Sequence, residues 1–97
     1  MTISIHSILA ATNSQTSCEI SAETIILDFA KGAYFGLDEI GTLIWRLLQQ
    51  PQSVSAICDV VVAEYEVDRA TCEEDLIGLL ETLHAEGLIE VRAAPAT

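Results

Sequence analysis

The hydrophobic pattern changes period at Asp38, inside the stretch 28–48. Before this residue, apolar and polar side chains alternate over 33–37, as in a half-buried strand. After it, apolar residues recur about every 3.6 positions, as in a helix. Asp38 can cap that helix with its carboxylate, and Glu39 lies where the positive end of the helix dipole favours an acid. A short strand that passes directly into a helix is expected to lie near a sheet edge.

Two further strand-like segments precede this one, and the three together predict an antiparallel meander. The first, 16–20, is weakly β-prone, whereas the second, 23–29, holds three consecutive branched apolar residues. Gly32 can take the positive φ that closes a short hairpin between the second and third strands. The third strand then turns Phe35 and its alternate neighbours to one face, and needs no partner on its far side.

Three helices are predicted downstream, over 39–49, 54–65 and 69–86, with a short strand possible at 88–92. Ser53 and Asp68 are the expected caps of the second and third helices, and Gly87 lies where a left-handed residue commonly ends a helix.

The third predicted helix carries a wider apolar arc than packing on one side requires. Its core stripe is Cys72, Leu76, Leu79 and Leu83, and the residues that widen the arc are Ala70, Ile77 and Leu80. Either a second element of the fold or a partner covers the additional surface.

The length of 97 residues, of which 51% are hydrophobic, predicts one small α+β domain. We assign 15–92 to this domain, 1–14 to an N-terminal segment of open role, and 93–97 to a flexible tail. No apolar run approaches the ~18 residues that span a bilayer, and no base precedes the apolar N-terminal residues as in a signal peptide. A cytoplasmic location is therefore expected.

The formal net charge of −11 argues against binding to nucleic acid or to an anionic membrane. The bases are Lys31, Arg46, Arg69 and Arg92, which occur singly and form no basic stripe. The acidity is explained either by solubility or by a partner with a basic or neutral surface.

No arrangement of residues predicts catalysis, a metal site or a cofactor. The three cysteines form no Cys-x-x-Cys pair, and Cys58 and Cys72 fall on apolar helix faces, where free thiols pack as small hydrophobes. His6 and His84 belong to no motif, and the acids 73–75 begin a helix whose dipole already favours them. We expect a protein that is not an enzyme.

Several motifs occur together, in order, across residues 15–92. They are Glu23-x-x-Ile-Leu-Asp28, Gly32-x-Tyr-Phe-Gly-Leu-Asp-Glu-x-Gly41, Ile44-Trp45-x-Leu-Leu, Tyr65-x-Val-Asp68, and Asp75-Leu76…Leu79-Leu80-x-x-Leu83…Gly87-Leu88-Ile89. This combination resembles the PqqD-like family, whose small domains are called RiPP recognition elements in pathways of ribosomally made, modified peptides. Within the family the chain is most similar to the free-standing form associated with lasso-peptide gene clusters.

The resemblance implies a winged-helix-like domain, with a three-stranded antiparallel N-terminal sheet followed by three helices. It also implies that the leader segment of a precursor peptide adds to the third strand and lies against the third helix. The domain then hands the precursor to a processing enzyme such as a protease or a radical enzyme. The implied peptide-binding positions are Ala33, Tyr34, Phe35, Gly36, Leu37, Arg69, Ala70, Glu73, Leu76, Ile77, Leu80 and His84.

Two other functions stay open from the residues alone. Three helices with strands also suit a winged-helix transcription regulator, although the acids 73–75 would then face phosphates. A homodimeric scaffold could use the same open sheet edge.

Overall fold

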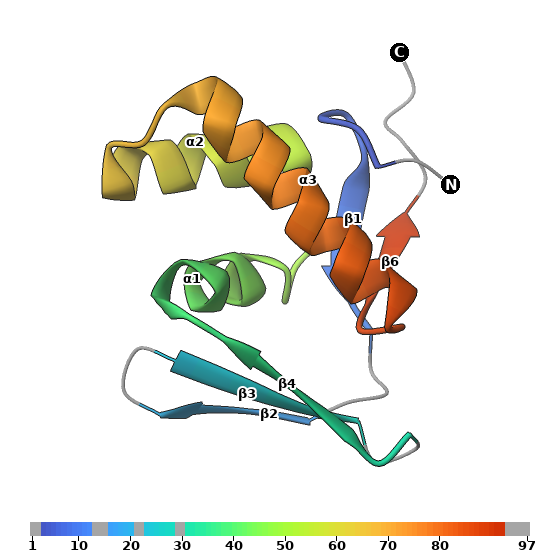
Figure 1. Ribbon diagram of the computed structural model, residues 1–97. Coiled ribbons are helices and arrows are strands. Elements are labelled where there is room, and N and C mark those ends of the chain that lie inside the picture. The colour runs from blue at the N-terminus through green and yellow to red at the C-terminus, as the bar shows by residue number, and fades with distance from the viewer. Residues whose placement is uncertain (1–2, 13–15, 21–22, 29–30, 93–97) are drawn as a thin grey trace.

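The computed structural model describes residues 3–12, 16–20, 23–28 and 31–92, and its elements follow one another as Figure 1 shows. In chain order these are β1 Ile8–Ala11, β2 Thr16–Ile20, β3 Glu23–Asp28, β4 Ala33–Leu37, α1 Glu39–Leu47, β5 Gln52–Ser53, α2 Val54–Tyr65, α3 Arg69–Ala85 and β6 Ile89–Arg92. The predicted α+β, winged-helix-like class is confirmed, with a three-stranded antiparallel sheet followed by three helices in the described part of the chain.

The predicted meander is the sheet β2-β3-β4, in which both strand pairs are antiparallel. Gly32, at φ 64°, forms the turn before β4, as expected for a residue without a Cβ. The register sets Phe35 opposite Ile26, which is 1% exposed, and Tyr34 opposite Leu27. Alternation along β4 therefore turns Phe35 and Leu37 inwards, while Tyr34 is 76% exposed on the outer face.

Helix α1 begins directly after β4 because Asp38 leaves the strand and caps the helix. Its Oδ1 accepts a hydrogen bond from the Gly41 N–H at 2.8 Å. A Cβ at position 41 would lie 3.1 Å from Leu37 Cβ, so glycine lets the first turn of α1 lie close against β4. Trp45 is buried in the core, and its Nε1 hydrogen has no acceptor among the described residues.

Helices α2 and α3 have the predicted caps, since Ser53 Oγ accepts from the Ala56 N–H and an Asp68 carboxylate oxygen accepts from the Thr71 N–H. Gly87 follows α3 at φ 76°, the left-handed conformation expected after a helix C-terminus. In Figure 1, α1 lies between the sheet β2-β3-β4 and the pair α2 and α3. One apolar core therefore joins the sheet to all three helices.

The N-terminal segment 1–14, whose role the sequence left open, contributes a strand to a second sheet. Its β1 lies between β5 and β6 in the order β5-β1-β6, and pairs antiparallel with both. Leu9 is fully buried there, and Ile3 is 2% exposed. Residues 3–11 are thus part of the domain, so the predicted boundary at residue 15 does not separate them from it.

Most predicted boundaries are close to the observed ones. The first helix is shorter than the predicted 39–49, because Leu48 is already its C-cap, and the third ends at Ala85. The predicted strand end at residue 29 and the tail 93–97 lie outside the described residues.

A buried hydrogen bond joins the sheet to α1, and its removal tests how α1 is held. Thr24 Oγ1 donates to Thr42 Oγ1 at 2.9 Å, and both residues are at most 2% exposed. Thr42→Val leaves the Thr24 hydroxyl buried without this partner, so we expect a loss of about 1–3 kcal/mol in the free energy of unfolding. The double variant Thr24→Val/Thr42→Val should recover part of this loss, as measured by chemical denaturation. A double variant no more stable than Thr42→Val would contradict this role.

Candidate functional site

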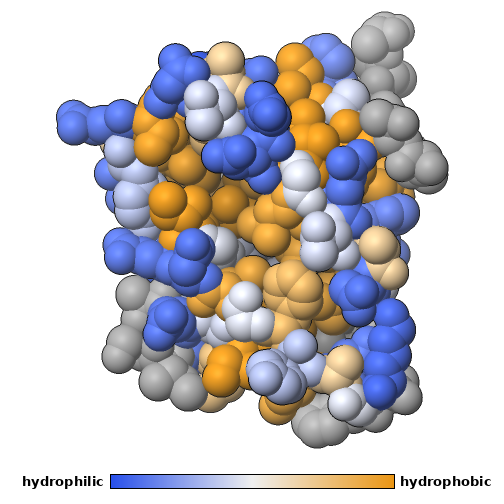
Figure 2. Space-filling view, viewed as in Figure 1, coloured by the Kyte–Doolittle hydropathy of each residue, from blue (hydrophilic) through white to orange (hydrophobic). Residues whose placement is uncertain are grey.

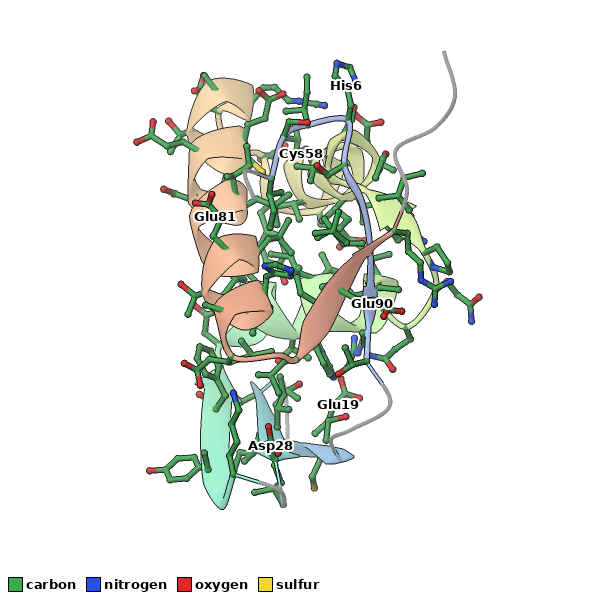
Figure 3. The ribbon with its side chains drawn as sticks, turned by 90° about the vertical axis from the view of Figure 1, so that its right-hand side faces the viewer. His6, Glu19, Asp28, Cys58, Glu81 and Glu90 are labelled. Atoms are coloured by element: carbon green, nitrogen blue, oxygen red, sulfur yellow. The ribbon has the colours of Figure 1, made fainter. Side chains whose placement is uncertain are left out.

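Strand β4 is an edge strand. It pairs with β3 on one side, and the described residues provide no strand on its other side, because β1 pairs with β5 and β6 instead. The side view in Figure 3 shows β4 on the same side of the molecule as α3, with β1 and β6 lying apart from it. The outer backbone N–H and C=O groups of such a strand can pair with an additional strand.

A groove opens beside this edge, between β4 and the start of α1 on one side and α3 on the other. Its volume is about 540 Å³. Figure 2 shows apolar side chains gathered in the middle of this face, with hydrophilic side chains around them. The residues that line the groove are Phe35, Gly36, Leu37, Asp38, Ile40, Gly41, Ile44, Val61, Val67, Thr71, Cys72, Asp75, Leu76 and Leu79.

One face of α3 forms the helical wall of the groove. Thr71, Asp75 and Leu79 recur every four residues along it, and Cys72 and Leu76 lie beside them. The rest of the lining comes from β4 and Asp38, from α1, from α2 through Val61, and from Val67 before α3. Together these elements give the groove an apolar floor that belongs to the main core.

The structure brings four of the predicted binding residues to the groove. These are Phe35, Gly36, Leu37 and Leu76. Ala33 and Tyr34 line a smaller adjoining hollow together with Phe35, Lys31 and Glu86. In that hollow Lys31 Nζ donates to the Glu86 carbonyl oxygen at 2.8 Å, which joins the turn before β4 to the C-terminal end of α3.

The other predicted helix residues do not line the groove, and Leu80 requires a correction. Leu80 is fully buried, so it belongs to the core stripe and cannot lie on an exposed shoulder. Leu79, predicted as core, is half-buried in the groove wall instead. The apolar face of α3 that borders the groove is therefore displaced around the helix axis from the predicted one. Ala70, Ile77 and His84 lie outside the groove lining.

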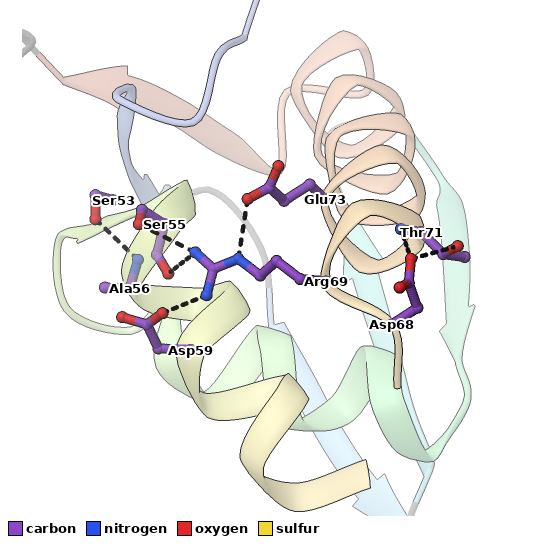
Figure 4. Close-up of polar contacts among 8 residues, drawn as sticks. All are labelled: Ser53, Ser55, Ala56, Asp59, Asp68, Arg69, Thr71 and Glu73. Atoms are coloured by element: carbon purple, nitrogen blue, oxygen red, sulfur yellow. Dashed lines mark hydrogen bonds and ion pairs between the residues drawn. The ribbon is translucent and has the colours of Figure 1, made fainter. Parts of the chain in front are cut away.

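Arg69 and Glu73 also lie outside the groove lining, and they connect α3 to α2 (Figure 4). The guanidinium of Arg69 pairs with Glu73 Oε2 at 2.9 Å and with Asp59 of α2, and it donates to Ser55. Hydrogen bonds from Arg69 to Asp59 and then to Glu73 raise the pKa of Arg69 above its ordinary value. This network positions the N-terminal turn of α3 against α2, and thereby the wall of the groove.

The floor and one end of the groove were not predicted from the sequence. Ile44, Val61 and Cys72 are buried in the core, as was predicted for Cys72, and they also line the groove. Gly41 is the residue that could have indicated this end of the groove, because a glycine inside a helix costs helix stability and so favours a site of close packing. The observed close approach to Leu37 places it at the end of β4.

The described residues hold no cluster of three or more His, Cys, Asp or Glu side chains that could bind a metal ion. None of the helices seen in the structure has the length and apolarity needed to cross a bilayer.

Comparison with protein families gives a match to the family described as coenzyme PQQ synthesis protein D (PqqD), over residues 23–89. The chain belongs to the PqqD family. The match begins with β3 and ends at the first residue of β6, so it includes β4, α3 and the groove between them. A search of curated proteins gave no match.

Two solved structures have the same fold as this PqqD-family chain. One is TbiB1 in complex with the TbiA(beta) leader peptide, with 38% sequence identity and a TM-score of 0.79, over 87% of this chain and 98% of that one. The other is lasso peptide synthetase B1 complexed with the leader peptide, with 23% identity and a TM-score of 0.75, over 84% of this chain and 96% of that one. Because its sequence identity is only 23%, the second structure supports the fold and not a shared function.

The reactivity of the three cysteine thiols can show whether solvent reaches the groove floor. Cys18 is exposed, Cys58 is buried, and Cys72 at the groove floor is 7% exposed. Burial, with the neighbouring Cys72 thiol as a lesser cause, raises the pKa of Cys58 from 9.0 to about 11. Since the folded-state pKa is the higher, this thiol stabilises the fold below pH 9 and less as the pH rises from 9 to 11.

We therefore expect one cysteine, Cys18, to react rapidly with a chromogenic disulfide reagent in the native protein at pH 8. All three cysteines should react rapidly after denaturation. The fast phase should disappear in Cys18→Ser. A fast phase that persists in Cys18→Ser would show that the groove floor is open to solvent.

Proposed function

We propose that this PqqD-family domain binds the leader segment of a ribosomally made precursor peptide in the groove between β4 and α3. The observation that carries the proposal is the open edge of β4 beside an apolar groove in the same face of the domain. The 38% identity to TbiB1, solved with a leader peptide, supports it.

Addition of a peptide strand would use both the open edge of β4 and the apolar groove beside it. An extended peptide that pairs with β4 gains backbone hydrogen bonds, which give affinity with little dependence on sequence. Alternate side chains of an added strand point to one face, so every second peptide side chain would face the groove. Apolar side chains at those positions would lose contact with water against Phe35, Leu76 and Leu79, which selects among peptides.

We further propose that the domain delivers the bound precursor to a separate processing enzyme, such as a protease or a radical enzyme, and is itself not catalytic. The cytoplasmic location expected from the sequence stays a prediction.

A winged-helix transcription regulator is disfavoured by where the bases lie. Arg46 pairs with Glu19, Arg92 pairs with Glu90, and Arg69 pairs with two acids of the helices. Lys31 donates to a carbonyl oxygen. In the described residues no basic surface is available for phosphates.

The groove position is tested by matched substitutions on α3. Leu79 and Ile77 are both half-buried and packed against the core, but only Leu79 lines the groove. Leu79→Ser should weaken leader binding about tenfold, because apolar contact with the peptide is lost, while Ile77→Ser should change it by less than about twofold. Isothermal titration with a synthetic leader peptide from a neighbouring precursor gene measures both affinities.

Circular dichroism and thermal unfolding of both variants control for the shared loss of core packing. Equal effects of the two substitutions on affinity would mean that the leader does not lie against this face of α3. A wild-type protein that does not bind the leader at tens of micromolar would contradict the proposed function itself.

A further inference from the structure

The ionisable side chains that line the groove are all acidic. Among its lining residues only Asp38 and Asp75 carry a charge, and no base accompanies them. The remaining lining is apolar except for Thr71. A carboxylate beside an apolar groove, with no cation of the protein near it, attracts a cationic group more strongly than the same carboxylate on an open surface.

The bases of the described chain are all engaged outside this groove. Arg46 pairs with Glu19, and Arg92 pairs with Glu90. Arg69 pairs with both Asp59 and Glu73. Lys31 lies at the adjoining hollow, beside the start of β4, and donates to the Glu86 carbonyl oxygen. The groove at the end of β4 thus contains only acids among its charged lining residues, whereas the hollow at the start of β4 contains Lys31 together with Asp28 and Glu86.

Asp75 is the more available of the two groove acids. Asp38 caps α1, so its Oδ1 is occupied by the Gly41 N–H and its charge is offset by the positive end of the helix dipole. Asp75 lies beyond the first turn of α3, is exposed, and has no hydrogen-bond or ion-pair partner among the residues described. Its charge is therefore free for a ligand in the groove.

We infer that the peptide bound in this groove carries a lysine or arginine beside Asp75, near the Leu37 end of the β4 edge. The inference rests on the proposed function and adds to it a charge requirement at one position of the leader. The basic side chain would place its charged group at Asp75 and its methylene stem along the apolar lining.

The test uses display of random peptides of about twenty residues, selected separately on the wild type, Asp75→Lys and Glu74→Lys. Glu74 is the matched control, because it is the adjacent acid of α3, is exposed, has no partner in the described structure and does not line the groove. Both reversals change the net charge equally, so their difference isolates contact at the groove.

We expect wild-type selection to enrich lysine or arginine at a fixed spacing from apolar positions. Asp75→Lys should replace this enrichment with Asp or Glu at the same position, and Glu74→Lys should leave it unchanged. For one selected peptide, Asp75→Asn should weaken binding about threefold at low salt, as an exposed ion pair allows, and less as salt increases.

Enrichment of apolar positions without a basic position on the wild type would overturn the inference and leave the proposed function intact. The same enrichment on Asp75→Lys as on the wild type would also overturn it. No selected peptide on the wild type, with native circular dichroism, would contradict the proposed function and the inference together.

Discussion

The cap formed by Asp38 is the local constraint on which the rest of the groove depends. One residue ends β4 and starts α1, and its hydrogen bond to the Gly41 N–H holds the first turn of the helix beside the strand. The chain therefore leaves the sheet at once, and no later strand in the described part of the chain pairs with β4. With β1 taken into the other sheet, the described residues leave the backbone groups of β4 open to a partner.

The opposite wall depends on contacts at both ends of α3. Near its N-terminus, Arg69 joins the helix to Asp59 and Ser55 of α2. Beyond its C-terminus, the Glu86 carbonyl oxygen accepts from Lys31, which belongs to the turn before β4. Because both walls are held by these contacts, the groove is already formed without a ligand. Binding then costs less conformational entropy.

Local patterns predicted most of this fold, because they depend on neighbours in sequence. The change of period at Asp38, the turn at Gly32 and the caps Ser53 and Asp68 each depend on a few adjacent residues. The pairing of β1 with β6 could not be predicted, because it joins segments at opposite ends of the chain. The four residues Ile8–Ala11 alone also show too short a hydrophobic pattern.

The sequence also could not determine which face of α3 is turned to the core, because this too depends on contacts between distant segments. Leu79 and Leu80 are both apolar, and only the packing of α2 and β6 decides which of them is fully buried.

Amide hydrogen exchange tests most directly whether β4 receives a peptide strand. Exchange would be followed residue by residue with and without a saturating leader peptide. We predict that the amides of 33–37 that face away from β3 exchange more slowly when the leader is bound, while those of β1 and β6 keep their rates. Unchanged exchange across 33–37 with the peptide bound, or protection confined to β6, would contradict strand addition at this edge.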